Sequence, residues 1–194
     1  MKTIKLLALL AIFIGFNSCS DNDDDDPTLQ IETETVSNLY APQAGGQGQP
    51  ISGDYKKFDF STGETTMSAT DWDIAFRGTD IIINGGVSSG ETDEPSRTGD
   101  AGAYIANGTM AGVTSANVSL LTQDTENAHV LANWYTYAGP PTHSINPTAG
   151  KILVIRTRDG RYAKVEILSY YEDGEANADF TDYRYYTFNY VYQP

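Results

Sequence analysis

The strongest constraint on the fold is the segment 152–171, in which β-branched and aromatic residues surround a central Asp159-Gly160 pair. Valine, isoleucine and tyrosine favour extended strands. Aspartate followed by glycine is typical of a type I′ turn, because both positions of that turn need a positive φ. The segment therefore predicts a β-hairpin closed by a type I′ turn.

Short runs that alternate apolar and polar residues continue along the rest of the chain. They occupy residues 55–60, 71–77, 80–83, 103–105, 129–137 and 183–192. Glycine- and proline-rich turns separate them, and no segment keeps a 3.6-residue apolar repeat. We therefore expect one all-β domain over residues 31–194. Two regions, 86–99 and 105–128, fit either long loops or irregular hairpins.

The last run indicates how the C-terminus packs. Period-two alternation places Tyr186, Phe188, Tyr190 and Tyr192 on one face of a strand. We expect residues 183–192 to close the sheet as its final strand, with these rings in the core.

The N-terminus has the pattern of an export signal. Lys2 and Lys5 precede an apolar run, residues 6–16, which is too short for a membrane span. Phe16-Asn17-Ser18-Cys19 resembles a loose lipobox, and Cys19 is the only cysteine of the chain. We predict a signal peptide over residues 1–18, with lipidation of Cys19 as the only membrane contact.

Acidic residues dominate the mature chain. The sequence has 12 Lys and Arg against 26 Asp and Glu, which argues against nucleic acid as a partner. The densest acidic run, residues 21–26, cannot bury anything and predicts a solvated linker over residues 19–30. An acidic run here also resembles the signal that directs lipoproteins of the Bacteroidota to the outer face of the outer membrane.

Catalytic motifs are missing from the sequence. It has no Gly-x-Ser-x-Gly elbow and no His-Glu-x-x-His zinc motif, and its single cysteine is assigned to lipidation. Its two histidines, His129 and His143, fall in separate runs. We therefore do not expect an enzyme.

Several motifs together resemble the HmuY family of haem-binding lipoproteins, or haemophores, of the Bacteroidota. They are DWDIAFR at 71–77 with NGG at 84–86, WYTY at 134–137 with THSI at 142–145, the hairpin 151–171, and YYTFNYVYQ at 185–193. The resemblance extends from about residue 31 to the C-terminus. It implies a β fold shaped like a right hand, with long finger hairpins that hold haem.

The same resemblance implies a role at the cell surface. A member of this family takes haem outside the cell, in some cases from host or environmental haemoproteins. It passes the haem to a TonB-dependent receptor in the outer membrane. Haem is therefore the cofactor to expect here.

Candidate ligands follow from the family and from the residues present. Axial ligands in the family are pairs of His or Met about thirty residues apart, and Met110 and His143 show that separation. His143 follows Pro140-Pro141, a context typical of a loop tip. His129 is the fallback ligand, expected to open a strand at the base of a finger, and Met67 is expected to be structural.

Aromatic side chains supply a second group of candidates. Tyr104, Trp134, Tyr135 and Tyr137 could stack on a porphyrin, although aromatic residues on strands are more often core or cross-strand pairs. The rival interpretation of the whole chain is a surface β module without haem. Its aromatic residues would then bind a partner protein or a glycan.

Overall fold

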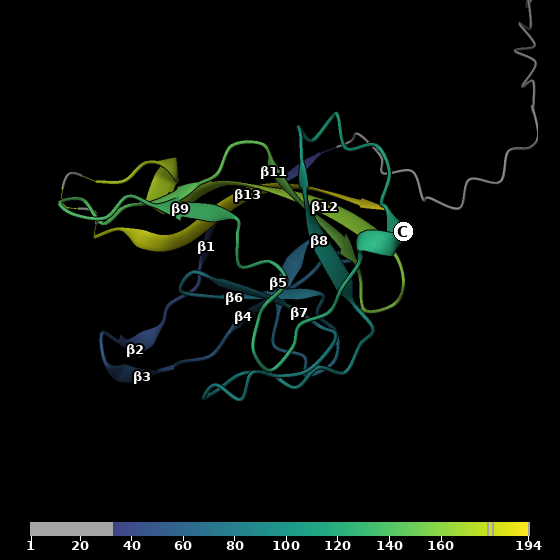
Figure 1. Cartoon of the computed structure of the whole chain (residues 1–194), viewed down its shortest axis with the longest axis horizontal. Coiled ribbons are helices and arrows are strands. Elements are labelled where there is room, and N and C mark those ends of the chain that lie inside the picture. The colour runs from purple at the N-terminus through teal and green to yellow at the C-terminus, as the bar shows by residue number, and fades with distance from the viewer. Residues whose placement is uncertain (1–32, 178, 180, 194) are drawn as a thin grey trace, which may run out of the picture.

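The structure is a computed structural model that describes residues 33–177, 179 and 181–193. The predicted signal peptide, Cys19 and the acidic run lie outside these residues. The described part of the chain forms thirteen antiparallel strands and two short 3-10 helices, η1 (Val118–Leu120) and η2 (Glu172–Gly174) (Figure 1). None of its helices is long and apolar enough to span a membrane.

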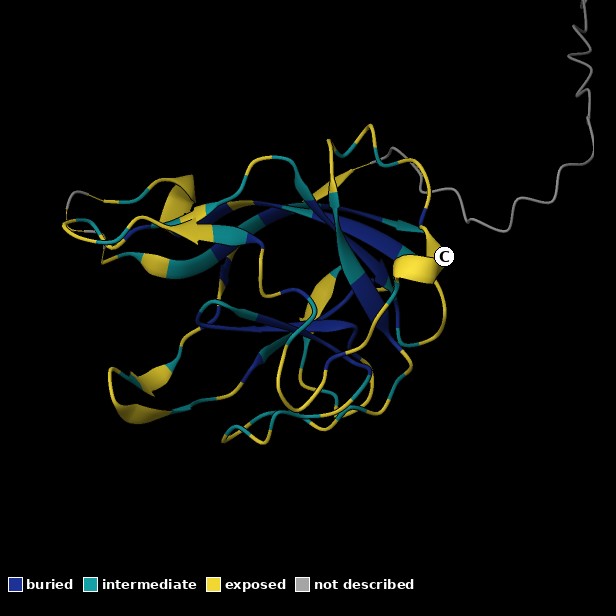
Figure 2. Ribbon diagram, in the orientation of Figure 1, coloured by how far each residue is buried: buried dark blue, intermediate teal, exposed yellow. Residues whose placement is uncertain are grey.

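Two sheets pack face to face. The five-stranded sheet has the order β1 (Glu34–Tyr40), β13 (Tyr183–Gln193), β12 (Tyr162–Tyr171), β11 (Lys151–Arg156) and β8 (Gly102–Asn107). The four-stranded sheet has the order β5 (Glu64–Thr66), β4 (Lys56–Asp59), β6 (Ile74–Arg77) and β7 (Asp80–Ile83). Buried residues concentrate between them (Figure 2). The fold is all-β, as predicted.

Aromatic side chains from both sheets meet in this core. Phe188 of β13 packs against Phe58 of β4 and Phe76 of β6, with ring centroids 5.5 and 5.6 Å apart. Tyr186 and Tyr190 are also buried, while Tyr192 is partly buried. This confirms the predicted inward face of the last strand. Burying such rings contributes roughly 1.5–3 kcal/mol each.

The last strand does not close the sheet, however. β13 pairs with β12 on one side and with β1 on the other, so β1 forms the sheet edge. The sequence around β1, residues 34–40, is too polar to indicate a strand by alternation. It becomes one because β13 offers a long row of backbone donors and acceptors.

Two small ribbons project from the sandwich on the same side (Figure 1). One is formed by β2 (Ala44–Gly46) and β3 (Gln49–Ser52), and the other by β9 (Tyr135–Tyr137) and β10 (Ile145–Pro147). Their tips are exposed (Figure 2). The β9–β10 ribbon ends in the loop that carries His143.

The hairpin predicted over 152–171 is confirmed as β11 and β12. Its turn differs from the prediction. Only Gly160 has a positive φ, and the loop is closed by hydrogen bonds from Gly160 N to Thr157 O and from Thr157 N to Arg161 O. A three-residue loop with glycine in the left-handed region replaces the two-residue type I′ turn.

The prediction of a strand over 129–137 is wrong for its first half. Residues 129–134 form turns, and only β9 is extended. Of the two open regions, 86–99 is a long loop, while 105–128 combines the end of β8 with a loop that contains η1. The long loop is fixed by Asn84, whose side chain donates to Thr70 O and Trp72 O and accepts from Thr98 N and Gly99 N.

An ionic cluster ties the β11–β12 turn to the opposite sheet. The Arg158 guanidinium contacts both carboxylate oxygens of Asp59, at 3.1 and 3.2 Å, and Asp73 Oδ1 at 3.1 Å. Asp73 also accepts hydrogen bonds from Phe60 N and Arg158 N. Asp73 of the DWDIAFR motif is thus a structural residue.

Candidate functional site

The described surface has two principal hollows, which we name by position. The tip hollow, of about 480 Å³, lies where the β9–β10 ribbon leaves the sandwich. Gln43, Gly78, Thr79, Pro141, Thr142, His143, Ile145, Tyr170, Tyr171, Asp179, Tyr183 and Arg184 line it. The edge groove, of about 1070 Å³, lies between β1 and the β4–β5 pair.

His143 occupies an exposed position at the end of the β9–β10 ribbon. Its φ of 53° is unusual for a residue other than glycine. The Tyr137 hydroxyl and His143 Nδ1 are hydrogen-bonded across the loop, and the two rings stack with centroids 5.8 Å apart. The structure therefore brings together two of the candidates named from the sequence. A histidine held through Nδ1 presents Nε2 to whatever enters the hollow.

The floor of the tip hollow is made of tyrosines. Tyr171 Oη accepts a hydrogen bond from Ile145 N at 2.9 Å, which joins the ribbon to β12. Burial raises the pKa of Tyr170, and the nearby Arg184 guanidinium partly opposes the shift. Both tyrosines therefore stay protonated and neutral near pH 7. They are core residues, 3% and 6% exposed, so they shape the hollow more than they offer ring surface to a ligand.

Arg184, on β13, also lines the tip hollow. Its Nη1 donates to Gln43 O at 2.7 Å, and its guanidinium lies 4.8 Å from the centre of the Tyr183 ring. Its φ is 77°. Sequence reasoning missed this residue. The available signal was a single cation inside a strand otherwise composed mainly of aromatic residues.

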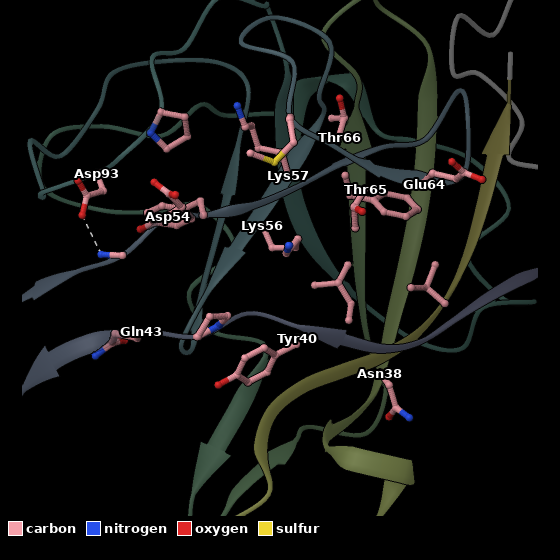
Figure 3. A pocket seen from close by; sticks show the side chains of 18 of the residues that line it. Asn38, Tyr40, Gln43, Asp54, Lys56, Lys57, Glu64, Thr65, Thr66 and Asp93 are labelled. Atoms are coloured by element: carbon pink, nitrogen blue, oxygen red, sulfur yellow. Dashed lines mark hydrogen bonds between the residues drawn. The ribbon is translucent and has the colours of Figure 1, made fainter.

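The edge groove is larger but chemically different (Figure 3). It has no histidine among its lining residues. Its methionine, Met67, is 86% exposed, so the expectation that Met67 is structural is wrong. The Lys57 ammonium already donates to Ser68 O, and Asp93 accepts from Gly53 N. Tyr40, 47% exposed, stacks on Tyr185 at 4.5 Å and offers an aromatic surface.

Met110 lies on neither hollow. It packs with Tyr104 on the outer face of the five-stranded sheet, against Ile152 and Val154. Its loop is held by the buried Lys164, whose Nζ donates to Met110 O at 2.7 Å and Val113 O at 2.9 Å. The Tyr104 hydroxyl accepts from Asn117 N. Met110 follows the end of β8, whereas His143 sits at the far end of the β9–β10 ribbon.

The three remaining candidates lie in the interior or beside it. Trp134 is 1% exposed and donates its indole N–H to Thr79 O, so its ring belongs to the core. Tyr135 is partly buried beside it. His129 Nε2 is buried, 3.9 Å from Glu94 Oε1, in the cluster formed by Glu94, Arg97 and Asp124. These positions favour structural roles, because none of the three side chains lines the tip hollow or the edge groove.

Among the described residues, no three His, Cys, Asp or Glu side chains converge on a possible metal-ion site. The tip hollow instead combines one imidazole, three tyrosines, one guanidinium and the carboxylate of Asp179. This donor set suits a flat aromatic ligand that takes a single imidazole and carries negative charge at its edge.

The model of the HmuY protein family matches residues 53–190, most of the chain. The chain belongs to the HmuY family. The apo HmuY analogue of Tannerella forsythia is a structural relative, with a TM-score of 0.53 and 14% identity over 90% of this chain and all of that one. At that identity the likeness shows the HmuY fold alone.

A structure from Bacteroides vulgatus, described as an HmuY-like haem-binding protein, gives a TM-score of 0.49 and 14% identity. It covers 82% of this chain and 90% of the relative. No protein of curated function matches the sequence significantly.

Proposed function

We propose that this HmuY-family chain binds haem in the tip hollow. Membership of the family supports the ligand, and the hydrogen bond between Tyr137 and His143 supports the place. When Nδ1–H donates to the tyrosine oxygen, the Nε2 lone pair of His143 is free to coordinate iron. Haem, when bound, would supply that iron and a flat apolar ring.

Met110 is the second residue that we propose would hold the iron. Its thioether now packs on the outer face of the five-stranded sheet, and Lys164 holds its backbone there. Coordination by both residues therefore requires the loop after β8 to leave Lys164. Without that movement, His143 is the only candidate ligand that lines the tip hollow.

The cellular role follows from the family and the N-terminus. We propose a non-enzymatic haemophore, anchored through lipidated Cys19 on the outer face of the outer membrane, that passes haem to a TonB-dependent receptor. The exposed loop position of His143 suits this role, because a ligand held at a tip can be handed on without opening the core. Cys19→Ala should leave the protein unprocessed or free of the membrane fraction, and membrane retention of that variant would contradict the anchor.

A specific observation supports one rival function. The exposed Tyr40 ring, stacked on Tyr185 beside the edge groove, is a suitable platform for a sugar ring or a partner side chain. In that case haem would not be the ligand, and the edge groove would be the site.

Titration of the mature chain with haemin separates these functions. We expect a shifted Soret band and the visible bands of ligated iron, with a large loss of affinity in His143→Ala. The loss should exceed the roughly 10–100-fold that removal of an outer-shell partner usually costs. Met110→Ala reports on the second ligand, and His129→Ala is the matched control. An unshifted spectrum of free haemin with the wild type would contradict haem binding.

A further inference from the structure

The tip hollow contains a cation that imidazole ligation does not explain. Among the described residues that line it, Arg184 and Asp179 are the only ones of formal charge, apart from His143. The chain as a whole carries a formal charge of −14, so the positive charge of a guanidinium at a hollow is opposite in sign to the net charge of the protein. A site for a neutral flat molecule would need no such group.

The backbone around Arg184 is distorted in a way that aims this side chain. β13 pairs regularly with β12 up to Phe188 opposite Ile167, and the register then shifts twice, first to Thr187 opposite Ser169 and then to Tyr183 opposite Tyr171. In the second shift, an advance of two residues on β12 corresponds to an advance of four on β13. Arg184 lies within this bulge and has a φ of 77°. Bulges of this kind redirect side chains, and they are common next to binding sites. The strand is kept in place by the hydrogen bond from Ala41 N to Arg184 O.

The contacts of the guanidinium leave it able to bind a carboxylate. It donates to the Gln43 carbonyl, lies over the Tyr183 ring and interacts with the Tyr170 hydroxyl, and these contacts orient its plane. Within the described part of the chain, no carboxylate lies within ion-pairing distance of it, although Asp179 lines the same hollow. An arginine has five N–H donors in a planar fork that matches a carboxylate.

We propose that Arg184 binds the peripheral carboxylates of the porphyrin and makes the tip hollow selective for carboxylate-bearing tetrapyrroles. This rests on the proposed haem function and adds to it a second recognition element, independent of iron. His143 recognises the metal, and Arg184 recognises the acidic edge of the ring. The two contributions can therefore be separated with ligands that lack one feature or the other.

The test compares four ligands: haemin, haemin dimethyl ester, metal-free protoporphyrin IX and its dimethyl ester. Binding is followed by the Soret band for the iron forms and by fluorescence for the metal-free forms. We expect the mature wild-type chain to bind each free acid roughly tenfold more tightly than its ester, as one charge-assisted hydrogen bond would give. Arg184→Gln should remove the preference, whereas Arg184→Lys should keep part of it.

Arg161→Gln is the matched control, because it removes the same charge from an exposed position in the β11–β12 connection, away from the hollow. It should keep the tenfold preference. His143→Ala should lower the affinity for the iron forms and leave the acid-to-ester ratio of the metal-free forms unchanged.

The ligand comparison needs no variant, so it decides the matter even if Arg184→Gln fails to fold. Equal affinity of the wild type for acid and ester would overturn the role of Arg184 while leaving haem binding intact. An absence of binding to every tetrapyrrole would overturn the proposed function itself. Preference for the acid that persists in Arg184→Gln would also overturn the assignment.

Discussion

Two arginines stand at opposite ends of the β12–β13 pair, and their surroundings differ. Arg158, in the β11–β12 turn, contacts the carboxylates of both Asp59 and Asp73. Arg184, at the other end, donates to a backbone carbonyl and lies over an aromatic ring. Arg158 has its charge neutralised inside the protein, whereas Arg184 has a charge that a ligand can still neutralise.

The difference separates a structural end of the sandwich from the end at which we propose binding. At the Arg158 end, side-chain charges join the two sheets, and hydrogen bonds with Asp59 raise the pKa of Arg158 despite its partial burial. At the Arg184 end, His143 and Arg184 both have positive φ, and Tyr183 is exposed. Strained backbone and available polar groups are typical of binding sites.

The largest effect should come from removing the paired arginine. Arg158→Ala would leave Asp59 and Asp73 buried without their counter-charge, at a cost of about 3 kcal/mol in the free energy of unfolding. Denaturant unfolding measures this, with Arg161→Ala as the exposed control. Porphyrin affinity of the folded fraction should not change. A loss below about 0.5 kcal/mol would show that this cluster does not hold the sheets together.

A second substitution tests the binding end through its histidine. Tyr137→Phe removes the hydroxyl that holds His143 Nδ1 and keeps the ring stack. Losing such an outer-shell partner should lower haem affinity roughly 10–100-fold. Because Tyr137 is 55% exposed, the melting temperature should stay the same.

The control for that experiment is Tyr40→Phe, which makes the same change at the edge groove and should leave haem affinity unaltered. If Tyr40→Phe weakened haem binding and Tyr137→Phe did not, the ligand would belong in the edge groove.

Lowering the pH should change the stability of the structural end through two carboxylates, Asp59 and Asp73, whose effects have opposite signs. Burial alone would raise the pKa of Asp59, but hydrogen bonds from Ser61 and Arg158 hold it below its usual value. Its stabilisation is therefore present above pH about 4 and is lost as pH falls further. Burial raises the pKa of Asp73, so the folded state gains a proton, and stability, as pH falls toward about 4.

Unfolding curves between pH 2 and 7 check both signs. Asp59→Asn should flatten the loss of stability below pH about 4. Asp73→Asn should remove the gain in stability that the wild type shows as the pH falls toward about 4. The same slopes in both variants and the wild type would show that other carboxylates, such as Glu94, control the acid response.

The sequence was sufficient to predict the structure wherever local residue patterns determine it. The 151–171 hairpin, the inward rings of β13 and the all-β class all follow from period-two alternation and turn residues. The tip position of His143 followed from its proline neighbours. Local patterns failed for β1, which is a strand only because β13 lies beside it. Trp134 is a core residue, which agrees with the alternative that aromatic residues of this kind are more often core than ligand contacts.

Arg184 could not be recognised for a related reason. Its contacts with Gln43 and with the hollow join segments more than a hundred residues apart in sequence, and its orientation depends on a bulge that alternation does not reveal. Lys164 is similar, since a lysine in a strand predicts an exposed charge. Here its ammonium is buried against two loop carbonyls.

The smallest effect should be that of the unpaired arginine on stability. Arg184→Gln removes one hydrogen bond to Gln43 O and the stack on Tyr183, but it leaves no buried carboxylate without a counter-charge. We expect it to cost about 1 kcal/mol or less, well below the cost of Arg158→Ala. Denaturant unfolding of the two variants under identical conditions gives the comparison directly. If Arg184→Gln cost as much as Arg158→Ala, Arg184 would be a structural residue like its counterpart. The difference between the two ends would then lie in His143 alone.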